Sequence, residues 1–189
     1  MSLAQLPLRM SVDEFLSWAA DTPGRWQLVD GVPCAMSPAG VLHGVLQGEL
    51  AGLLRDHLRA SGSACRVVVA PGVIPRVLAQ HNMRVPDLAV TCGAFGPDTR
   101  ALTDPVLVVE ILSPSNQADT WANVWAYTSI PSVRDILVLR SDRRAASLLR
   151  RGADGVWPEQ PEEISDGLLV MESVGLSVLI RDVYVGTGL

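Results

Sequence analysis

The stretch PVLVVEIL, residues 105–112, is the most hydrophobic run in this 189-residue chain. An almost continuous apolar run of this length is typical of a strand that is buried on both faces of a sheet. One charged residue, Glu110, lies inside the run, and a buried carboxylate is costly unless a partner compensates its charge. The run therefore predicts a central strand in which Glu110 needs such a partner.

Other elements are predicted on both sides of this strand. A capping box at Ser11 and apolar residues at helical spacing predict helices over residues 12–20, 42–58 and 119–127. The Asp30-Gly31 pair predicts a hairpin. Further strands are expected at 85–91, 135–139, 145–149 and 168–171, with two pieces over 65–77. Residues 152–164 are expected to form a polar loop, and 178–185 a terminal segment.

This order of elements predicts an α+β fold, in which helices flank a mixed central sheet. The length favours a single domain over residues 1–189, with a core from about 11 to 185. No apolar run is long enough to span a membrane. Residues 1–10 have no continuous apolar core, so we expect no secretory signal and a cytoplasmic location.

Composition excludes several chemistries. All 15 basic residues are arginines, so no mechanism that uses a lysine side chain is available to the chain. The net charge of −5 argues against a broad basic surface that coats nucleic acid, although a local arginine patch stays compatible with it. The three cysteines, at positions 34, 65 and 92, form no CxxC pair, and we expect buried, reduced thiols.

Two acids are candidates for metal binding. Asp87 follows Pro86 at the start of a short apolar strand, and Glu110 comes 23 residues later, near the end of the most hydrophobic one. Carboxylates at adjacent strand ends can converge on one Mg²⁺, which prefers hard oxygen ligands. Acids at strand ends are common in any protein, so this pair alone is a weak signal.

The sequence as a whole resembles the Uma-type family of restriction-endonuclease-like proteins, a bacterial branch of the PD-(D/E)XK nuclease superfamily. The resemblance runs from about Ser11 to Tyr184. Six segments carry it, in this order: RWQLVDGVPCAMSP (25–38) followed by His43; VPDLAV (85–90); PVLVVEILSPSN (105–116); Asp119 with Tyr127 eight residues on; SIPSVRDILVL (129–139); and an arginine pair before GADGVW (152–157).

This resemblance implies a restriction-endonuclease-like core with Asp87 and Glu110 as metal ligands, completed by the carbonyl of Ile111. The family's catalytic lysine corresponds to Asn123, on one helical stripe with Asp119 and Tyr127. Its early acid corresponds to Gln27. The resemblance also implies a supporting role for His43, because a His is usual at that place in the family. Ser113, directly after the Glu110 strand, caps the following loop or takes a direct supporting role.

Two functions remain open at this point. The first is a Mg²⁺- or Mn²⁺-dependent endonuclease that hydrolyses phosphodiester bonds in DNA, with a degenerate site in which amides replace the lysine and the early acid. The second is a catalytically inactive member of the fold that binds nucleic acid or regulates. DNA is the expected partner, and a homodimer is compatible with either function. No membrane partner and no small-molecule cofactor are expected.

Overall fold

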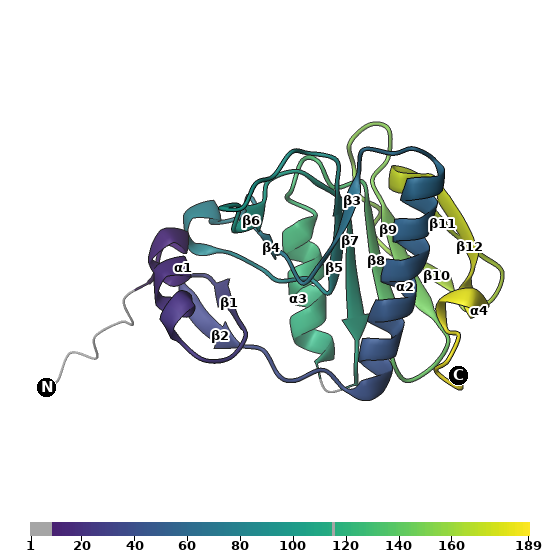
Figure 1. Cartoon of the computed structure of the whole chain (residues 1–189), viewed down its shortest axis with the longest axis horizontal. Helices are drawn as coiled ribbons and strands as arrows, with labels where there is room; N and C mark the ends of the chain where they lie inside the picture. The colour runs from purple at the N-terminus through teal and green to yellow at the C-terminus, as the bar shows by residue number, and fades with distance from the viewer. Residues whose placement is uncertain (1–8, 115) are drawn as a thin grey trace, which may run out of the picture.

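The computed structural model describes residues 9–114 and 116–189. The prediction that no secretory signal is present therefore falls almost entirely outside the described residues. A six-stranded sheet forms the centre of the molecule (Figure 1), in the order β10 (Glu162–Ile164), β9 (Ala146–Arg150), β8 (Asp135–Arg140), β7 (Pro105–Leu112), β5 (Leu88–Thr91) and β3 (Arg66–Val69). Within this sheet only β7 and β8 pair in parallel, so the sheet is mixed.

Strand β7 is the PVLVVEIL run, and every residue of it except Val106 is buried. Helices cover both faces of the sheet, so neither face of β7 reaches water (Figure 1). This double coverage explains why the strand shows no polar–apolar alternation. The predicted α+β class with a mixed central sheet is confirmed.

On one face, helix α2 (Val41–Ala60) packs against the sheet through Leu46, Leu50, Leu54 and Leu58, which repeat every four residues. The same core includes the hairpin β11 (Leu168–Met171) and β12 (Leu176–Leu179), the turn η2 (Glu172–Val174) and the short helix α4 (Ile180–Val183). Helix α3 (Gln117–Tyr127) covers the opposite face, where Val124 and Tyr127 are fully buried.

The N-terminal part forms a separate small core beside the sheet (Figure 1). Helix α1 (Val12–Asp21) packs on the hairpin β1 (Trp26–Val29) and β2 (Val32–Ala35). Asp30 and Gly31 both have positive φ, at 50° and 84°, as a two-residue hairpin turn of this kind requires. Backbone bonds from Leu28 to Met83 join the hairpin to the chain before β5. The remaining elements are β4 (Gly72–Val73), β6 (Ala101–Leu102) and η1 (Ala79–His81).

Two expectations need correction. Residues 162–164 are not part of a loop but form the edge strand β10, because they pair with β9. Cys65 and Cys92 are not reduced thiols but form a disulfide. The register pairs Arg66 with Thr91, so the next residues outward meet across the β3–β5 pair, which a spacing of 27 in sequence does not reveal.

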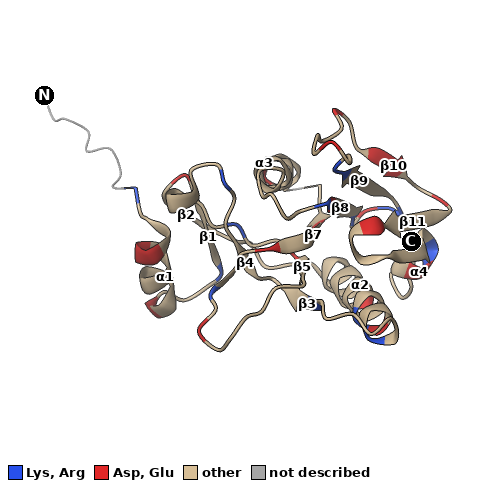
Figure 2. Cartoon of the chain, turned by 90° about the horizontal axis from the view of Figure 1, so that it is seen from above, with Lys and Arg blue, Asp and Glu red and all other residues tan. Residues whose placement is uncertain are grey.

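Within the described residues, no helix combines the length and hydropathy needed to cross a bilayer. Figure 2 shows the arginines scattered along the chain, in loops as well as in helices and strands. This distribution agrees with the negative net charge.

Candidate active site

Asp87 and Glu110 meet at one edge of the β5–β7 pair. In this antiparallel pair Leu88 lies opposite Val109, and continuing the register by one residue places Asp87 opposite Glu110. Residues directly opposite each other point to the same face, with their Cβ atoms about 5 Å apart. Both side chains line the same cavity. The pairing of the two strands therefore brings together two acids that lie 23 residues apart.

Three groups fix the position of Asp87. The Nε2 atom of His43 lies 2.8 Å from Oδ1, and the backbone N–H of Ile111 donates to Oδ2 at 2.7 Å. Gln47, one turn after His43 on α2, donates from Nε2 to the backbone carbonyl of Asp87 at 2.8 Å. The first turns of α2 thus orient this carboxylate, and each of its oxygens keeps a lone pair available for another ligand.

Glu110 is in a different environment. Its side chain is buried, with 7% of the residue exposed, and Oε1 accepts a hydrogen bond from the Tyr127 hydroxyl at 2.7 Å. Burial and the neighbouring Asp87 charge raise the pKa of Glu110 to about 8, against the opposing effect of hydrogen bonds from Tyr127 and Asn123. The pKa of Tyr127 is raised as well, mainly by burial. Near neutral pH the protonated form of Glu110 is therefore favoured in the absence of a cation.

Two amides, Gln27 and Asn123, lie beside the acid pair. Nδ2 of Asn123 donates to Oε1 of Gln27 at 3.4 Å, a long hydrogen bond that links α3 to the β1–β2 hairpin. Asn123 is 9% exposed and lies one turn before Tyr127 on the stripe of α3 that faces the sheet. The stripe forms because positions four apart project from one side of a helix.

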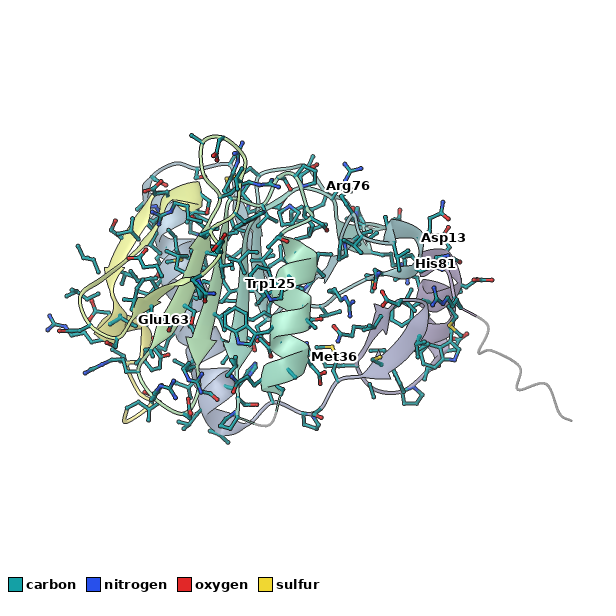
Figure 3. The ribbon with its side chains drawn as sticks, turned by 180° about the vertical axis from the view of Figure 1, so that it is seen from behind. Asp13, Met36, Arg76, His81, Trp125 and Glu163 are labelled. Atoms are coloured by element: carbon teal, nitrogen blue, oxygen red, sulfur yellow. A yellow bond between two sulfur atoms is a disulfide. The ribbon has the colours of Figure 1, made fainter. Side chains whose placement is uncertain are left out.

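These groups open into a cavity of about 650 Å³ between the hairpin, the start of α2 and the start of α3. Figure 3 shows Met36, which lines this cavity, between α3 and the β1–β2 hairpin. The polar and charged side chains of the lining are Arg25, Gln27, Ser37, His43, Asp87, Glu110, Ser113, Asn116, Asp119, Thr120, Asn123 and Ser141.

The residues that sequence reasoning singled out fall into two groups. Asp87, Glu110, Asn123 and Gln27 line the cavity, and so do three of the supporting residues: His43, Asp119 and Ser113. Tyr127 lies behind Glu110, and Ile111 contacts Asp87 through its N–H, whereas the expected metal ligand is its carbonyl. The roles assigned to these residues stay predictions.

Sequence reasoning missed several polar residues of the site, among them Arg25, which lines the cavity, and Gln47, which contacts Asp87. Gln47 follows His43 by four positions, so the helical period that placed His43 also predicts its proximity. Arg25 precedes Gln27 by two positions, and residues two apart in a strand share a face. Both signals were present in the spacing, but neither residue type is diagnostic by itself.

The donor set fits a hard divalent cation. Within residues 9–114 and 116–189 no three His, Cys, Asp or Glu side chains converge as a metal cluster. A pair of carboxylates is enough for Mg²⁺, which usually binds one or two carboxylates and keeps several waters. Asp87 and Glu110 repel each other when both are ionised, and a cation between them would relieve that repulsion.

Comparison with known proteins places the chain in a family. Residues 12–181 match the model of the Uma2 family, whose description is "Putative restriction endonuclease". An uncharacterized protein of Synechocystis is 31% identical over 180 residues, which cover 94% of this chain and 93% of that protein. The fold matches the crystal structure of a "putative nuclease belonging to DUF820" from Anabaena variabilis, with a TM-score of 0.72 and 19% identity over 93% of this chain and 97% of that one. The protein whose acids and amides form this cavity belongs to the Uma2 family.

Proposed function

We propose that this protein is an endonuclease that depends on Mg²⁺ or Mn²⁺ and hydrolyses phosphodiester bonds in DNA. The observation that carries the proposal is the pair formed by Asp87 and Glu110 across β5 and β7, in a cavity large enough for a phosphodiester. Membership of the Uma2 family supports the same reaction class.

In this proposal Asp87, Glu110 and the Ile111 carbonyl hold the metal. When bound, Mg²⁺ or Mn²⁺ would lower the pKa of a coordinated water and offset charge on the phosphate. His43 and the Ile111 N–H orient the Asp87 carboxylate, and Tyr127 orients Glu110 through its hydroxyl. Each ligand is thus fixed by a second group, which keeps the geometry from relaxing when the cation leaves.

Gln27 and Asn123 take part as neutral groups. Their amides can hydrogen-bond the attacking water or a phosphate oxygen, but neither supplies positive charge. The loss of one well-placed electrostatic donor typically costs about 10²–10³ in rate, or about 2.7–4 kcal/mol. We therefore expect a slow nuclease.

The test is cleavage of supercoiled plasmid by purified protein in Mg²⁺, in Mn²⁺ and in EDTA. We expect slow nicking that needs metal and that falls to the EDTA level in Asp87→Ala and in Glu110→Gln. The matched control is Asp142→Ala, which removes an acid from the turn after β8, where it pairs with Arg140 outside the cavity. This control should keep wild-type activity.

Two results would contradict the proposal. Cleavage that survives Asp87→Ala would point to a contaminating nuclease. If the folded wild type binds DNA but cleaves none under any metal condition, the protein is the non-catalytic member of the fold that the two amides also allow.

A further inference from the structure

Arg25 is the one lysine or arginine among the residues that line the cavity in the described part of the chain. Three acids, Asp87, Glu110 and Asp119, line it as well. A nucleic-acid strand carries one negative charge per phosphate. Ionised carboxylates in the cavity lining repel it, and among the described lining side chains only the Arg25 guanidinium carries a permanent positive charge that attracts it. The position of Arg25 therefore decides whether the cavity has any fixed attraction for a phosphate.

The hairpin fixes the direction of Arg25. Trp26 and Leu28 pack on helix α1, with the Trp26 ring in an edge contact with Trp18 at 4.9 Å between centroids. Side chains alternate along a strand, so Arg25 and Gln27 project to the opposite side. Gln27 on that side reaches Asn123 of α3, and both line the cavity. Arg25 is one strand repeat away, about 7 Å along the hairpin. It also lines the cavity but is exposed, whereas Gln27 is half-buried, so Arg25 lies on the solvent side of the lining.

The backbone at this position is rigid, while the side chain is unused. The Met36 N–H donates to the Arg25 carbonyl at 2.8 Å, which extends the β1–β2 pairing by one residue. Within the described residues the exposed Arg25 guanidinium makes no hydrogen bond and no ion pair. An anchored backbone that carries a free guanidinium at the mouth of an acidic cavity is suited to bind an anion that enters there.

We propose that Arg25 binds a non-bridging phosphate oxygen of the nucleic-acid strand, one phosphate away from the bond that is cleaved. The inference rests on the proposed function and adds a substrate-binding residue to it. A guanidinium can hold a phosphate with two parallel hydrogen bonds. Because this phosphate does not react, the contact is equally strong in the ground state and the transition state. It therefore lowers Kd and KM and leaves kcat unchanged.

The experiment compares wild type with Arg25→Ala, Arg25→Lys and Arg100→Ala. Arg100 is the matched control, because it is exposed, does not line the cavity and lies between β5 and β6, at the end of β7 away from Glu110. Binding of a fluorescent 20-base-pair duplex and of its single strand is measured in EDTA over a range of salt concentrations. Cleavage kinetics in Mg²⁺ give KM and kcat, and thermal unfolding checks the fold.

We expect Arg25→Ala to weaken binding and raise KM about tenfold, with kcat within about twofold of wild type. The slope of log K against log salt should fall by about 0.9 for the duplex and by about 0.7 for the single strand. Arg25→Lys should restore the slope and most of the affinity, because it keeps the charge. Arg100→Ala should match wild type, and all variants should keep the wild-type melting temperature.

The outcomes separate this inference from the proposed function. If wild type binds and cleaves DNA while Arg25→Ala behaves like Arg100→Ala, only the role of Arg25 is overturned. A loss confined to kcat, or a loss that Arg25→Lys does not rescue, overturns the binding role too. If wild type neither binds nor cleaves either DNA form, the proposed function fails, and the role of Arg25 fails with it.

Discussion

Strands β7 and β8 lie side by side in the sheet, and each buries one carboxylate in a different way. Asp135 of β8 is fully buried, and it accepts hydrogen bonds from Arg150 at 3.1 Å and from the Ser173 N–H at 2.8 Å. Glu110 of β7 is almost as deeply buried, but its donors are the neutral Tyr127 and Asn123, and an acid lies opposite it. Asp135 thus has a cationic hydrogen-bond donor, whereas the hydrogen-bond donors of Glu110 are neutral.

This difference separates an acid with a structural partner, Asp135, from an acid that is a candidate metal ligand, Glu110. Arg150 also donates to Glu172 and to the Val170 carbonyl, so the cluster around Asp135 joins β8, β9 and the β11–β12 hairpin and is complete without a ligand. Around Glu110, burial and the neighbouring Asp87 charge both oppose ionisation. A buried carboxylate of this kind is costly in its charged form, which makes Glu110 a candidate ligand for a bound cation.

Removing the structural acid should have the largest effect. Asp135→Ala leaves the Arg150 guanidinium without its buried carboxylate, and breaking a buried pair in this way typically costs about 3–5 kcal/mol of unfolding free energy. Urea unfolding measures the loss. Asp142→Ala removes an acid paired with Arg140 near the surface and should cost no more than about 1 kcal/mol. Equal losses of unfolding free energy in the two variants would show that the buried ion pair of Asp135 contributes no more stability than the surface pair of Asp142.

If the proposed reaction is correct, a cation beside Glu110 should raise the cleavage rate. Asn123→Lys puts an ammonium there, and it should recover part of the about 2.7–4 kcal/mol that one positioned electrostatic donor contributes, a gain of about ten- to a hundredfold. Adding Gln27→Glu, at the position to which the resemblance assigns an early acid, should increase the gain further. Plasmid cleavage in Mg²⁺ compares wild type with both variants. If Asn123→Lys slows a fast wild type, Asn123 is an adapted catalytic residue rather than a replacement for a lost lysine.

Glu110 and Asp87 show which parts of the candidate site can be predicted from the sequence. PVLVVEIL predicted the central strand and the unusual position of Glu110 from a local pattern, and the four-residue repeat placed Asn123 and Tyr127 on one stripe of α3. The register that pairs β5 with β7 is not local, so the strand-end positions of Asp87 and Glu110 gave only a weak signal for their contact, and the family resemblance strengthened it.

Other contacts could not be predicted from the sequence. The Cys65–Cys92 bond depends on the register of β3 with β5, and the partners of Asp135 come from residues 15 to 38 positions away. For Arg25, the local pattern was visible in the sequence, because Arg25 and Trp26 alternate along a strand. The sequence does not say which side of the hairpin faces the cavity, so the place of Arg25 in the site could not be predicted.

Replacing Glu110 by a neutral isostere should change the pH dependence of stability. The folded pKa of about 8 lies above the ordinary value of 4.5, so the folded state keeps a proton that the unfolded state has released. Stability from this group is present below about pH 4.5 and is lost as pH rises toward 8, by up to about 1.4 kcal/mol per pH unit.

Glu110→Gln should flatten this decline in metal-free protein, because the amide oxygen still accepts from Tyr127 and carries no charge at any pH. Thermal unfolding in EDTA at pH 5, 6, 7 and 8 measures the difference. Glu159→Gln, in an exposed loop, serves as the control and should follow wild type. Parallel curves for wild type and Glu110→Gln would mean that Glu110 is already ionised at neutral pH. The environments of Glu110 and Asp135 would then not differ in how well they stabilise a charged carboxylate.

Mg²⁺ binding should displace the proton that Glu110 carries in the metal-free protein. A cation that needs ionised Glu110 competes with the proton on it, so Mg²⁺ affinity should fall by at most tenfold for each pH unit below 8 and become constant above it. Calorimetric titrations in buffers of different ionisation enthalpy should detect close to one proton released per Mg²⁺ bound at pH 7. In Asn123→Lys the new ammonium favours the ionised carboxylate, so the affinity should become constant at a lower pH and fewer protons should be released. Mg²⁺ binding that releases no proton and does not change between pH 6 and 8 would show that Glu110 binds the metal without having been protonated, or is not a ligand.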